Sequence, residues 1–314
     1  MSLKIVSGKI SRAVKTVIYG TEGVGKSTLA SKFPEPLFLD VEGGTSQMDV
    51  RRVEVNSSWD ELLSTVTEVF RDPSVCRTLV LDTADAAESL CIRHILQKYN
   101  QKSIESFGYG KGYTYIGEEW SKLMSIFDGL IDKGINVTVI AHAKQRKIEQ
   151  PDQVGAYDHW EMKLSKQVAP LLKEWADLLL FCNYKTYVVT TDSNTKKAQG
   201  GKRVMYSSHN PVYDAKNRYG LPDEMDLNFS GIADVFGNAP ALKKEQTPQE
   251  RLAELMAEAG ITDYQLRKVV AVKGHYPIET PLSDYSDKIV NGFCIKYFDK
   301  IVDMIRKEEG EEND

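Results

Sequence analysis

Eight residues from Gly20 to Ser27 have the types and spacing of a loop that holds phosphate groups. The run Gly-Thr-Glu-Gly-Val-Gly-Lys-Ser fits the pattern Gly-x-x-x-x-Gly-Lys-Ser/Thr, and it stands between an apolar run and a helical pattern. Its glycines let backbone N–H groups face an anion, and the following helix adds a partial positive charge. We expect Lys26 to contact the β- and γ-phosphates of ATP. The expected nucleotide-binding residues are Gly20, Thr21, Glu22, Gly23, Val24, Gly25, Lys26, Ser27 and Thr28.

An acidic residue, Asp82, directly follows the apolar run at residues 78–81. A carboxylate at the end of a buried strand can orient hydrated Mg²⁺ beside a bound nucleotide. The expected metal site therefore consists of Asp82 and the Ser27 hydroxyl. The alternative is that Asp82 caps a helix, but Asp85 is better placed for that role.

The catalytic base is expected on a neighbouring strand, because Thr83 directly follows Asp82 and cannot serve. The apolar run at residues 37–41 leads into Glu42, which two glycines follow. A carboxylate at such a strand tip can hold a water in line with the γ-phosphate. Glu42 is the predicted base, Asp40 is the alternative base, and an ordinary loop acid is the simplest interpretation.

A polar residue also ends the apolar run at residues 137–141, where His142 follows. In open α/β sheets, the carboxyl end of a central strand faces the ligand. His142 is therefore predicted to hydrogen-bond the γ-phosphate and to report hydrolysis. A histidine at such a point can also be only a satisfied polar side chain.

These residues need a parallel sheet to bring them together. Short apolar runs alternate with helical patterns over the first two-thirds of the chain, which indicates an α/β fold with a mainly parallel sheet flanked by helices. The expected strands are 16–19, 37–41, 78–81, 137–141 and 177–182. After them, segments 186–190 and 203–207 are expected to form a hairpin around the flexible polar stretch 192–201.

The chain is expected to divide into an ATPase core at 1–237, a linker at 238–247, a small helical domain at 248–307 and an acidic tail at 308–314. The formal net charge is −5, from 45 acidic and 40 basic residues, and five of the acids lie in that tail. The body is therefore neutral, which excludes a globally basic nucleic-acid coat but not a local basic groove. The tail is expected to be a solvated terminus; competition with DNA phosphates or docking of a partner is the alternative.

Composition narrows the class further. With 41% hydrophobic and 27% charged residues, the chain can bury a sizeable core. The four cysteines form no CxxC pair, which favours reduced, buried thiols. No apolar run has the length of a signal peptide or a membrane span, so a cytoplasmic location without membrane contact is expected.

The phosphate loop, the run Leu-Asp-Val-Glu at 39–42 and the run Ala-Lys-Asn-Arg-Tyr-Gly-Leu-Pro at 215–222 together resemble the RecA-like P-loop ATPases. The last run is similar to motifs of RadA and of replicative hexameric helicases, in which a Lys and an Arg reach a neighbouring subunit's γ-phosphate. The resemblance implies that Lys216 and Arg218 act in trans within a ring or filament of identical subunits. His142 departs from the glutamine that RecA carries at this position.

The most similar group is that of phage RecA-like annealing and recombination ATPases, whose Gly/Tyr-rich loop resembles residues 107–113 and the following Glu118-Glu119-Trp120. Cations and aromatic residues after His142, on an expected mobile loop, have the composition of a single-stranded DNA site. The expected DNA-binding residues are Lys144, Arg146, Lys147, Tyr157, Trp160 and Lys163. The alternatives are that Trp160 and Met162 pack under the next helix, or that residues 107–115 contact DNA or a neighbouring subunit.

The resulting hypothesis is a Mg²⁺-dependent, DNA-stimulated ATPase of phage-type recombination that anneals or pairs single-stranded DNA. A single-strand binding protein or another recombination factor is its expected partner. Three alternatives stay open: a nucleotide-dependent loader or switch, a helicase-like ring ATPase of replication and, less favoured, a small-molecule kinase. The kinase would need an Arg-rich lid, which the sequence does not contain.

Overall fold

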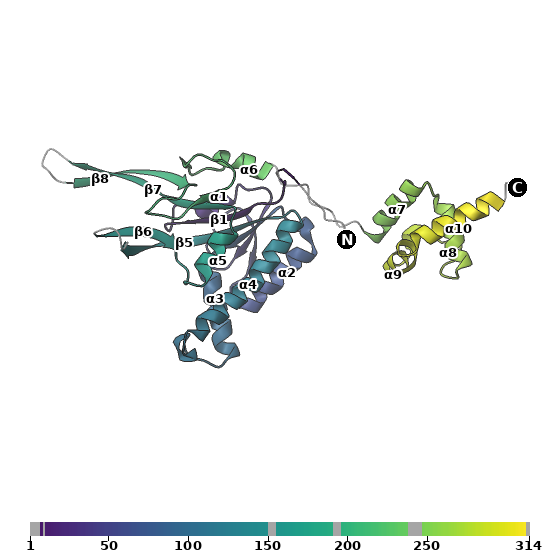
Figure 1. Ribbon diagram of the computed structural model, residues 1–314, viewed down its shortest axis with the longest axis horizontal. Helices are drawn as coiled ribbons and strands as arrows, with labels where there is room; N and C mark the ends of the chain where they lie inside the picture. Colours follow the sequence, from purple (N-terminus) through teal and green to yellow (C-terminus); the bar gives the residue numbers. More distant parts are fainter. Residues whose placement is uncertain (1–6, 9, 150–154, 191–195, 238–246, 312–314) are drawn as a thin grey trace. The chain divides into compact units, whose positions relative to one another are not determined.

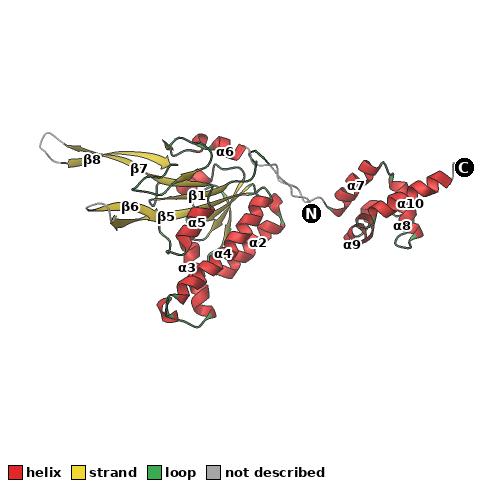
Figure 2. Ribbon diagram, in the orientation of Figure 1, coloured by secondary structure: helices red, strands yellow, loops and turns green. Residues whose placement is uncertain are grey.

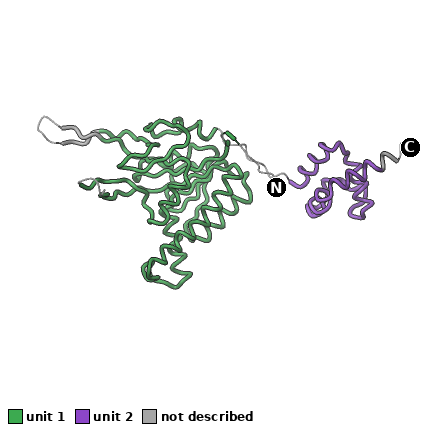
Figure 3. The backbone as a smooth tube through the Cα atoms, in the orientation of Figure 1, with its two compact units in different colours: residues 1–243 green, residues 244–314 purple. Residues whose placement is uncertain are grey.

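The computed structural model describes residues 7–8, 10–149, 155–190, 196–237 and 247–311 (Figure 1). The chain forms two compact units, residues 1–243 and residues 244–314 (Figure 3). Within the described residues, no helix is long and apolar enough to cross a membrane.

The first unit is built on one mixed sheet in the order β10-β8-β7-β1-β5-β4-β2-β3. Every neighbouring pair from β7 to β3 is parallel, and β8 and β10 add antiparallel strands at one edge. Two further strands leave this path, because β6 pairs with β5 and β9 pairs with β7. The strands are β1 (Lys15–Gly20), β2 (Pro36–Asp40), β3 (Arg51–Glu54), β4 (Thr78–Asp82), β5 (Asn136–Glu149), β6 (Ala156–Met162), β7 (Leu178–Thr190), β8 (Lys196–Tyr206), β9 (Lys216–Asn217) and β10 (Glu224–Asp226).

Helices cover both faces of this sheet (Figure 2). Side chains on both faces of the central strands are therefore buried, which explains why these strands are continuous apolar runs. On β1, Val17 and Tyr19 pack with the helices of one face, whereas Ile18 packs with those of the other. The first face carries α2 (Trp59–Arg71), α3 (Ala84–Lys98), α4 (Lys111–Asp132) and α5 (Val168–Trp175); the second carries α1 (Lys26–Ala30) and α6 (Ala233–Gly237). The expected α/β class with a mainly parallel sheet is confirmed.

Two β-ribbons extend beyond the sheet, at the left of Figure 1. Gly20, the last residue of β1, pairs with His142 on one side and with Cys182 on the other. Beyond that level β5 continues and pairs with β6, and β7 continues and pairs with β8. The phosphate loop therefore leaves the sheet between the bases of the two ribbons.

The ribbons correct two expectations. The loop predicted over residues 151–163 contains strand β6, and the polar stretch predicted as a hairpin tip contains the first residues of β8. Backbone pairing with a neighbouring strand forms these segments, although neither has the regular apolar alternation that a sequence pattern detects. Residues 150–154 and 191–195 lie outside the described residues.

The second unit is helical and has its own core. It contains α7 (Pro248–Ala259), α8 (Asp263–Val272), α9 (Asp287–Ile289), a π-helical segment (Val290–Ile295) and α10 (Phe298–Glu311). Capping boxes begin α7 at Thr247 and α8 at Thr262. The core side chains include Leu252, Leu266, Val270 and Ile301.

Two expected boundaries fall near the ends of this unit. Residues 238–246 of the expected linker and 312–314 of the expected acidic tail lie outside the described residues. Helix α10 continues to Glu311, four residues into the expected acidic tail, because glutamate is a good helix former.

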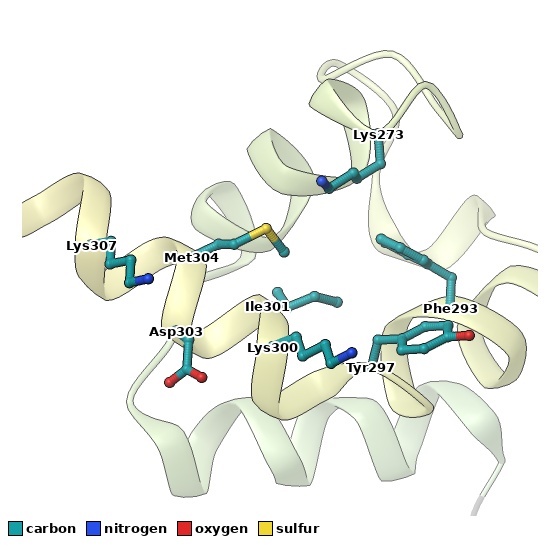
Figure 4. A pocket seen from close by; sticks show the side chains of 8 residues that line it. All are labelled: Lys273, Phe293, Tyr297, Lys300, Ile301, Asp303, Met304 and Lys307. Carbon is teal, nitrogen blue, oxygen red and sulfur yellow. The ribbon is translucent and has the colours of Figure 1, made fainter.

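A pocket of about 490 Å³ opens beside α10 in the second unit (Figure 4). Aromatic and aliphatic side chains form its interior, and lysines stand around it. Its lining residues are Lys273, Phe293, Tyr297, Lys300, Ile301, Asp303, Met304 and Lys307.

Candidate nucleotide-hydrolysis site

The phosphate loop joins β1 to α1, and its glycines meet two different demands. A Cβ at Gly20 would lie 2.0 Å from the carbonyl oxygen of Cys182, so this position must approach β7 without a side chain. Gly23 and Gly25 have φ angles of 70° and 110°, in the left-handed region. The curled backbone of the loop thus depends on glycine at 23 and 25. The close approach of the start of the loop to strand β7 depends on Gly20.

Lys26 is the first residue of α1 and is only 5% exposed. Its Nζ donates to the carbonyl oxygens of Gly20 at 3.0 Å and of Thr21 at 2.9 Å, so the side chain folds back over its own loop. Burial lowers the pKa of Lys26, and the nearby Asp82 acts in the opposite direction. The ammonium group of Lys26 is thus already positioned at the loop, where it can also donate to a bound phosphate group.

Asp82 ends β4 and is 2% exposed. Burial raises the pKa of Asp82 to about 6, although a hydrogen bond with Ser27 lowers it. Its Oδ2 is a buried acceptor that no described residue hydrogen-bonds. A buried carboxylate oxygen without a partner, beside a serine hydroxyl, fits a hydrated Mg²⁺.

Asp40 fastens the loop after β2. Its carboxylate accepts hydrogen bonds from the backbone N–H groups of Gly43 at 2.8 Å, Gly44 at 3.1 Å and Thr45 at 3.1 Å. The Thr45 hydroxyl also donates to it, at 2.5 Å. With these donors and 2% exposure, Asp40 is a loop anchor, and the alternative that it acts as base loses its support.

Glu42 is more open, because 35% of its side chain is exposed. Its Oε2 accepts a hydrogen bond from the Thr83 hydroxyl at 2.8 Å. Thr83, which sequence reasoning excluded as a base, thus orients the carboxylate that was predicted to be one. It also caps α3, through Ala86 N–H at 3.4 Å.

His142 ends the sheet portion of β5 and is tied to Asp85. The backbone N–H of His142 donates to Asp85 Oδ1 at 3.0 Å, and its Nδ1 lies 2.8 Å from Asp85 Oδ2. This hydrogen bond raises the pKa of His142 and outweighs burial. Burial alone would raise the pKa of Asp85, but the hydrogen bonds from His142 bring it below its usual value. Nδ1 also lies 4.0 Å from Glu42 Oε2.

Asp85 is therefore a residue whose role sequence reasoning missed. It was expected to cap α3, yet Thr83 is the N-cap and Asp85 in the first turn reaches His142 instead. The sequence offered one indication of this role: Asp85 lies only three residues after Asp82, close to the end of strand β4. Ligand atoms of Glu42, Asp85 and His142 all lie within 4.8 Å of one another.

The expected DNA-binding cations lie on the β5–β6 ribbon, where acids partly neutralise them. Lys144 and Arg146 lie 3.5 Å and 3.8 Å from Glu161. Lys163 lies 3.8 Å from Glu22 of the phosphate loop. Lys147 is exposed and has no ion pair among the described residues.

The aromatic residues of this ribbon differ in accessibility. Trp160 is half-buried, with its ring centroid 5.9 Å from that of Phe181, and Met162 is 1% exposed. The alternative placed both side chains under the next helix. Both pack against the core of the first unit, and the ring contact of Trp160 is with Phe181 of β7. Tyr157 is partly exposed near the end of the ribbon.

Lys216 and Arg218 lie at the opposite edge of the sheet from the phosphate loop. Strand β9 pairs with the beginning of β7, where Leu178 is level with Thr16 near the beginning of β1. Lys216 Nζ donates to the carbonyl oxygen of Glu174 at 2.9 Å, and Arg218 pairs with Asp177 at 2.8 Å. The length of β1, about 15–20 Å, separates them from their own phosphate loop. Lys216 and Arg218 therefore do not belong to the site formed by their own phosphate loop.

The Gly/Tyr-rich run lies between α3 and α4. Tyr109 is fully exposed, whereas Trp120 is fully buried against Trp59 at 5.8 Å between ring centroids. Trp120 is thus a core residue, and Tyr109 is the most exposed aromatic side chain of this run.

The strand order explains how these residues meet. Strand β5 lies between β1 and β4, so His142 lies between the phosphate loop and Asp82, and Glu42 follows the next strand, β2. This order and this site define a P-loop NTPase core.

Comparison with known proteins agrees with this class. The chain belongs to the AAA domain family, whose profile matches residues 12–219. It is 24% identical over 160 residues to the SPbeta prophage-derived uncharacterized protein YorG of Bacillus subtilis (strain 168). That match covers 47% of this chain and 48% of the relative, so the chain spans about half the length of the curated relative it matches.

A solved structure also matches, the flagellar accessory protein FlaH from Methanocaldococcus jannaschii. The identity is 11% and the TM-score is 0.34, over 63% of this chain and 79% of that one.

Proposed function

We propose that this protein is a Mg²⁺-dependent ATPase of phage-type recombination that binds single-stranded DNA and anneals or pairs it. The AAA domain supports ATP hydrolysis, and the similarity to a prophage-derived protein supports the phage context. The single observation that carries the DNA part is the continuity of β5. This strand ends its sheet portion at His142, 4.0 Å from the candidate base, and then forms the ribbon with Lys144, Arg146 and Lys147.

Each residue of the site has a role in this proposal. The loop N–H groups and Lys26 bind the phosphates, and Ser27 with Asp82 holds Mg²⁺, which neutralises charge on the phosphates when bound. Glu42, oriented by Thr83, holds the attacking water and accepts its proton. His142, whose pKa Asp85 raises, donates a hydrogen bond to the γ-phosphate.

A ring or filament of identical subunits is part of this proposal, and the position of Lys216 and Arg218 supports it. Because they lie at the edge away from their own phosphate loop, they serve catalysis only as fingers toward a neighbouring subunit of a ring or filament. Their hydrogen bonds to Glu174 and Asp177 must then be exchanged for phosphate contacts.

The test measures ATP hydrolysis with and without a 40-nucleotide oligo(dT) strand. We expect stimulation by DNA and complete loss in Lys26→Ala. In Glu42→Gln, the rate should fall about 100-fold while ATP affinity stays within about twofold, since the carboxylate acts on the attacking water and not on ATP itself. Absence of both DNA binding and stimulation in the presence of Mg²⁺ and ATP would refute the DNA part.

A charge-reversal substitution tests whether DNA binds to the β5–β6 ribbon. Lys147→Glu should weaken oligo(dT) binding about 3- to 10-fold at about 0.1 M salt, because Lys147 has no ion pair within the described part of the chain. Lys32→Glu is the matched control, since Lys32 is an exposed lysine in the turn that follows α1. Equal effects of both changes would place DNA elsewhere.

A second candidate is a nucleotide-dependent loader or switch. It is favoured by the separate core of residues 244–314, which provides a binding unit of its own. A single-strand binding protein or another recombination factor is the proposed partner of that unit. Retained biological activity in Glu42→Gln would favour the switch over the hydrolysis-driven protein.

A further inference from the structure

The β7–β8 ribbon touches the phosphate loop at two glycines. The Tyr184 hydroxyl donates to the Gly23 carbonyl oxygen at 3.1 Å. Arg203 Nη1 lies 3.4 Å from where a Cβ of Gly25 would be. Tyr184 and Arg203 are directly opposite each other across β7 and β8, so their side chains share one face of the ribbon.

Arg203 differs from the other cations near the base of this ribbon. Lys185 pairs with Glu224 at 2.5 Å, and Lys202 pairs with Asp226 at 2.5 Å. The Arg203 side chain is exposed, and no acid or other hydrogen-bond acceptor in the described residues engages its guanidinium. An arginine without a counter-charge therefore lies beside a loop built to hold anions.

We propose that Arg203 binds the phosphate chain of the nucleotide from within the same subunit, at the phosphates that ADP and ATP share. The inference rests on the nucleotide binding proposed above. Backbone N–H groups of such a loop cradle the α- and β-phosphates, whereas its lysine reaches the β- and γ-phosphates. Arg203 lies at Gly25, directly before Lys26, and its planar guanidinium can donate two parallel hydrogen bonds to phosphate oxygens.

Tyr184 is the positioning residue in this arrangement. Its hydrogen bond to Gly23 fixes the distance between the ribbon and the loop, and Arg203 extends from the strand opposite. This role differs from that of Lys216 and Arg218, which lie at the other edge of the sheet. Arg203 contributes to binding in cis, and it makes no contact that only the γ-phosphate provides.

Calorimetric titration of the full chain tests this assignment, with ADP and with a non-hydrolysable ATP analogue, both in Mg²⁺. We expect Arg203→Ala to raise the Kd of both nucleotides about tenfold, the loss of one charge-assisted contact. The Kd values of Arg203→Lys should lie between those of the wild type and Arg203→Ala, because lysine keeps the positive charge but lacks the two parallel N–H donors of the guanidinium. Lys202→Ala, the adjacent cation on the other ribbon face, should leave both Kd values within about twofold.

Several results would overturn the assignment. Unchanged Kd values in Arg203→Ala, with binding abolished in Lys26→Ala, would remove Arg203 from the site and leave the proposed function intact. A loss for the triphosphate alone would move the contact to the γ-phosphate. If Arg203→Ala lowers the melting temperature enough to explain its weaker nucleotide binding, and Arg203→Lys does not recover the affinity, Arg203 has a structural role instead. Failure of the wild type to bind either nucleotide would instead refute the proposed function.

Discussion

Replacing Asp82 by Asn should stabilise the protein when nucleotide and metal are absent. Asp82 is 2% exposed, its Oδ2 is a buried oxygen without a hydrogen-bond partner among the described residues, and burial raises its pKa to about 6. At neutral pH the folded chain must hold this carboxylate ionised in a poorly solvating site. The unfolded chain holds it in water, where its pKa is near 3.8.

The size of the effect follows from proton linkage. Because the folded-state pKa of this acid is raised, ionisation opposes folding: the cost is absent below about pH 3.8 and complete above about pH 6. A displacement from 3.8 to about 6 corresponds to about 3 kcal/mol at pH 8. At pH 4.5 only the interval above 3.8 counts, which leaves about 1 kcal/mol. Asparagine cannot ionise, so it removes this cost, although its own burial reduces the gain to about 1–3 kcal/mol at pH 8.

Urea unfolding in EDTA at pH 8 and at pH 4.5, followed by tryptophan fluorescence, measures the gain. The fluorescence reports the first unit alone, because the four tryptophans are Trp59, Trp120, Trp160 and Trp175. Asp49→Asn is the control, since Asp49 is exposed and without an ion pair among the described residues. An Asp82→Asn protein that is no more stable than the wild type at pH 8, or that gains equally at both pH values, would refute the reasoning.

Three further substitutions test other parts of the site. Asp85→Asn should lower the pKa of His142, followed by NMR titration, because the Asp85 hydrogen bond is the chief cause that raises it; an unchanged titration would contradict that cause. In the wild type, the stabilisation from this raised pKa is complete below about pH 6.5 and is lost as pH rises through the folded-state value. Gly20→Ala should destabilise the first unit by about 2–3 kcal/mol in urea unfolding, because its Cβ would lie 2.0 Å from the Cys182 carbonyl oxygen. Gly117→Ala, within α4 and with its nearest contact at 3.9 Å, should instead stabilise it by about 0.5–1 kcal/mol, and a loss similar to that of Gly20→Ala would refute the steric argument.

The fold could be predicted from the sequence wherever a strand is buried on both faces. Such strands are short continuous apolar runs, and β1, β2, β4 and the first residues of β5 and β7 all have this form. The ribbons could not be predicted in this way. Beyond the sheet, β6 and β8 depend on hydrogen bonds to a partner strand, and many of their residues are polar.

The same limit applies to the site. Lys26, Ser27 and Asp82 belong to local motifs, and the sequence assigned them without knowledge of the fold. Asp85 and Arg203 owe their positions to tertiary contacts: one reaches His142 across 57 residues, and the other reaches Gly25 from β8. Asp40 shows the opposite case, in which a well-placed acid is taken up by its own loop.

The phosphate loop has a separate contact with the base of each ribbon. Lys163 reaches Glu22 from the β5–β6 side, and Tyr184 reaches Gly23 from the β7–β8 side. The two contacts differ in kind: the first joins two exposed charges and weakens with salt, whereas the second is a hydrogen bond to a backbone carbonyl that salt hardly screens. The loop is therefore held more firmly to the β7–β8 ribbon than to the β5–β6 ribbon by these two contacts. On the β5–β6 side, the firmer connection runs through the Asp85 hydrogen bonds to His142, which are partly buried and short.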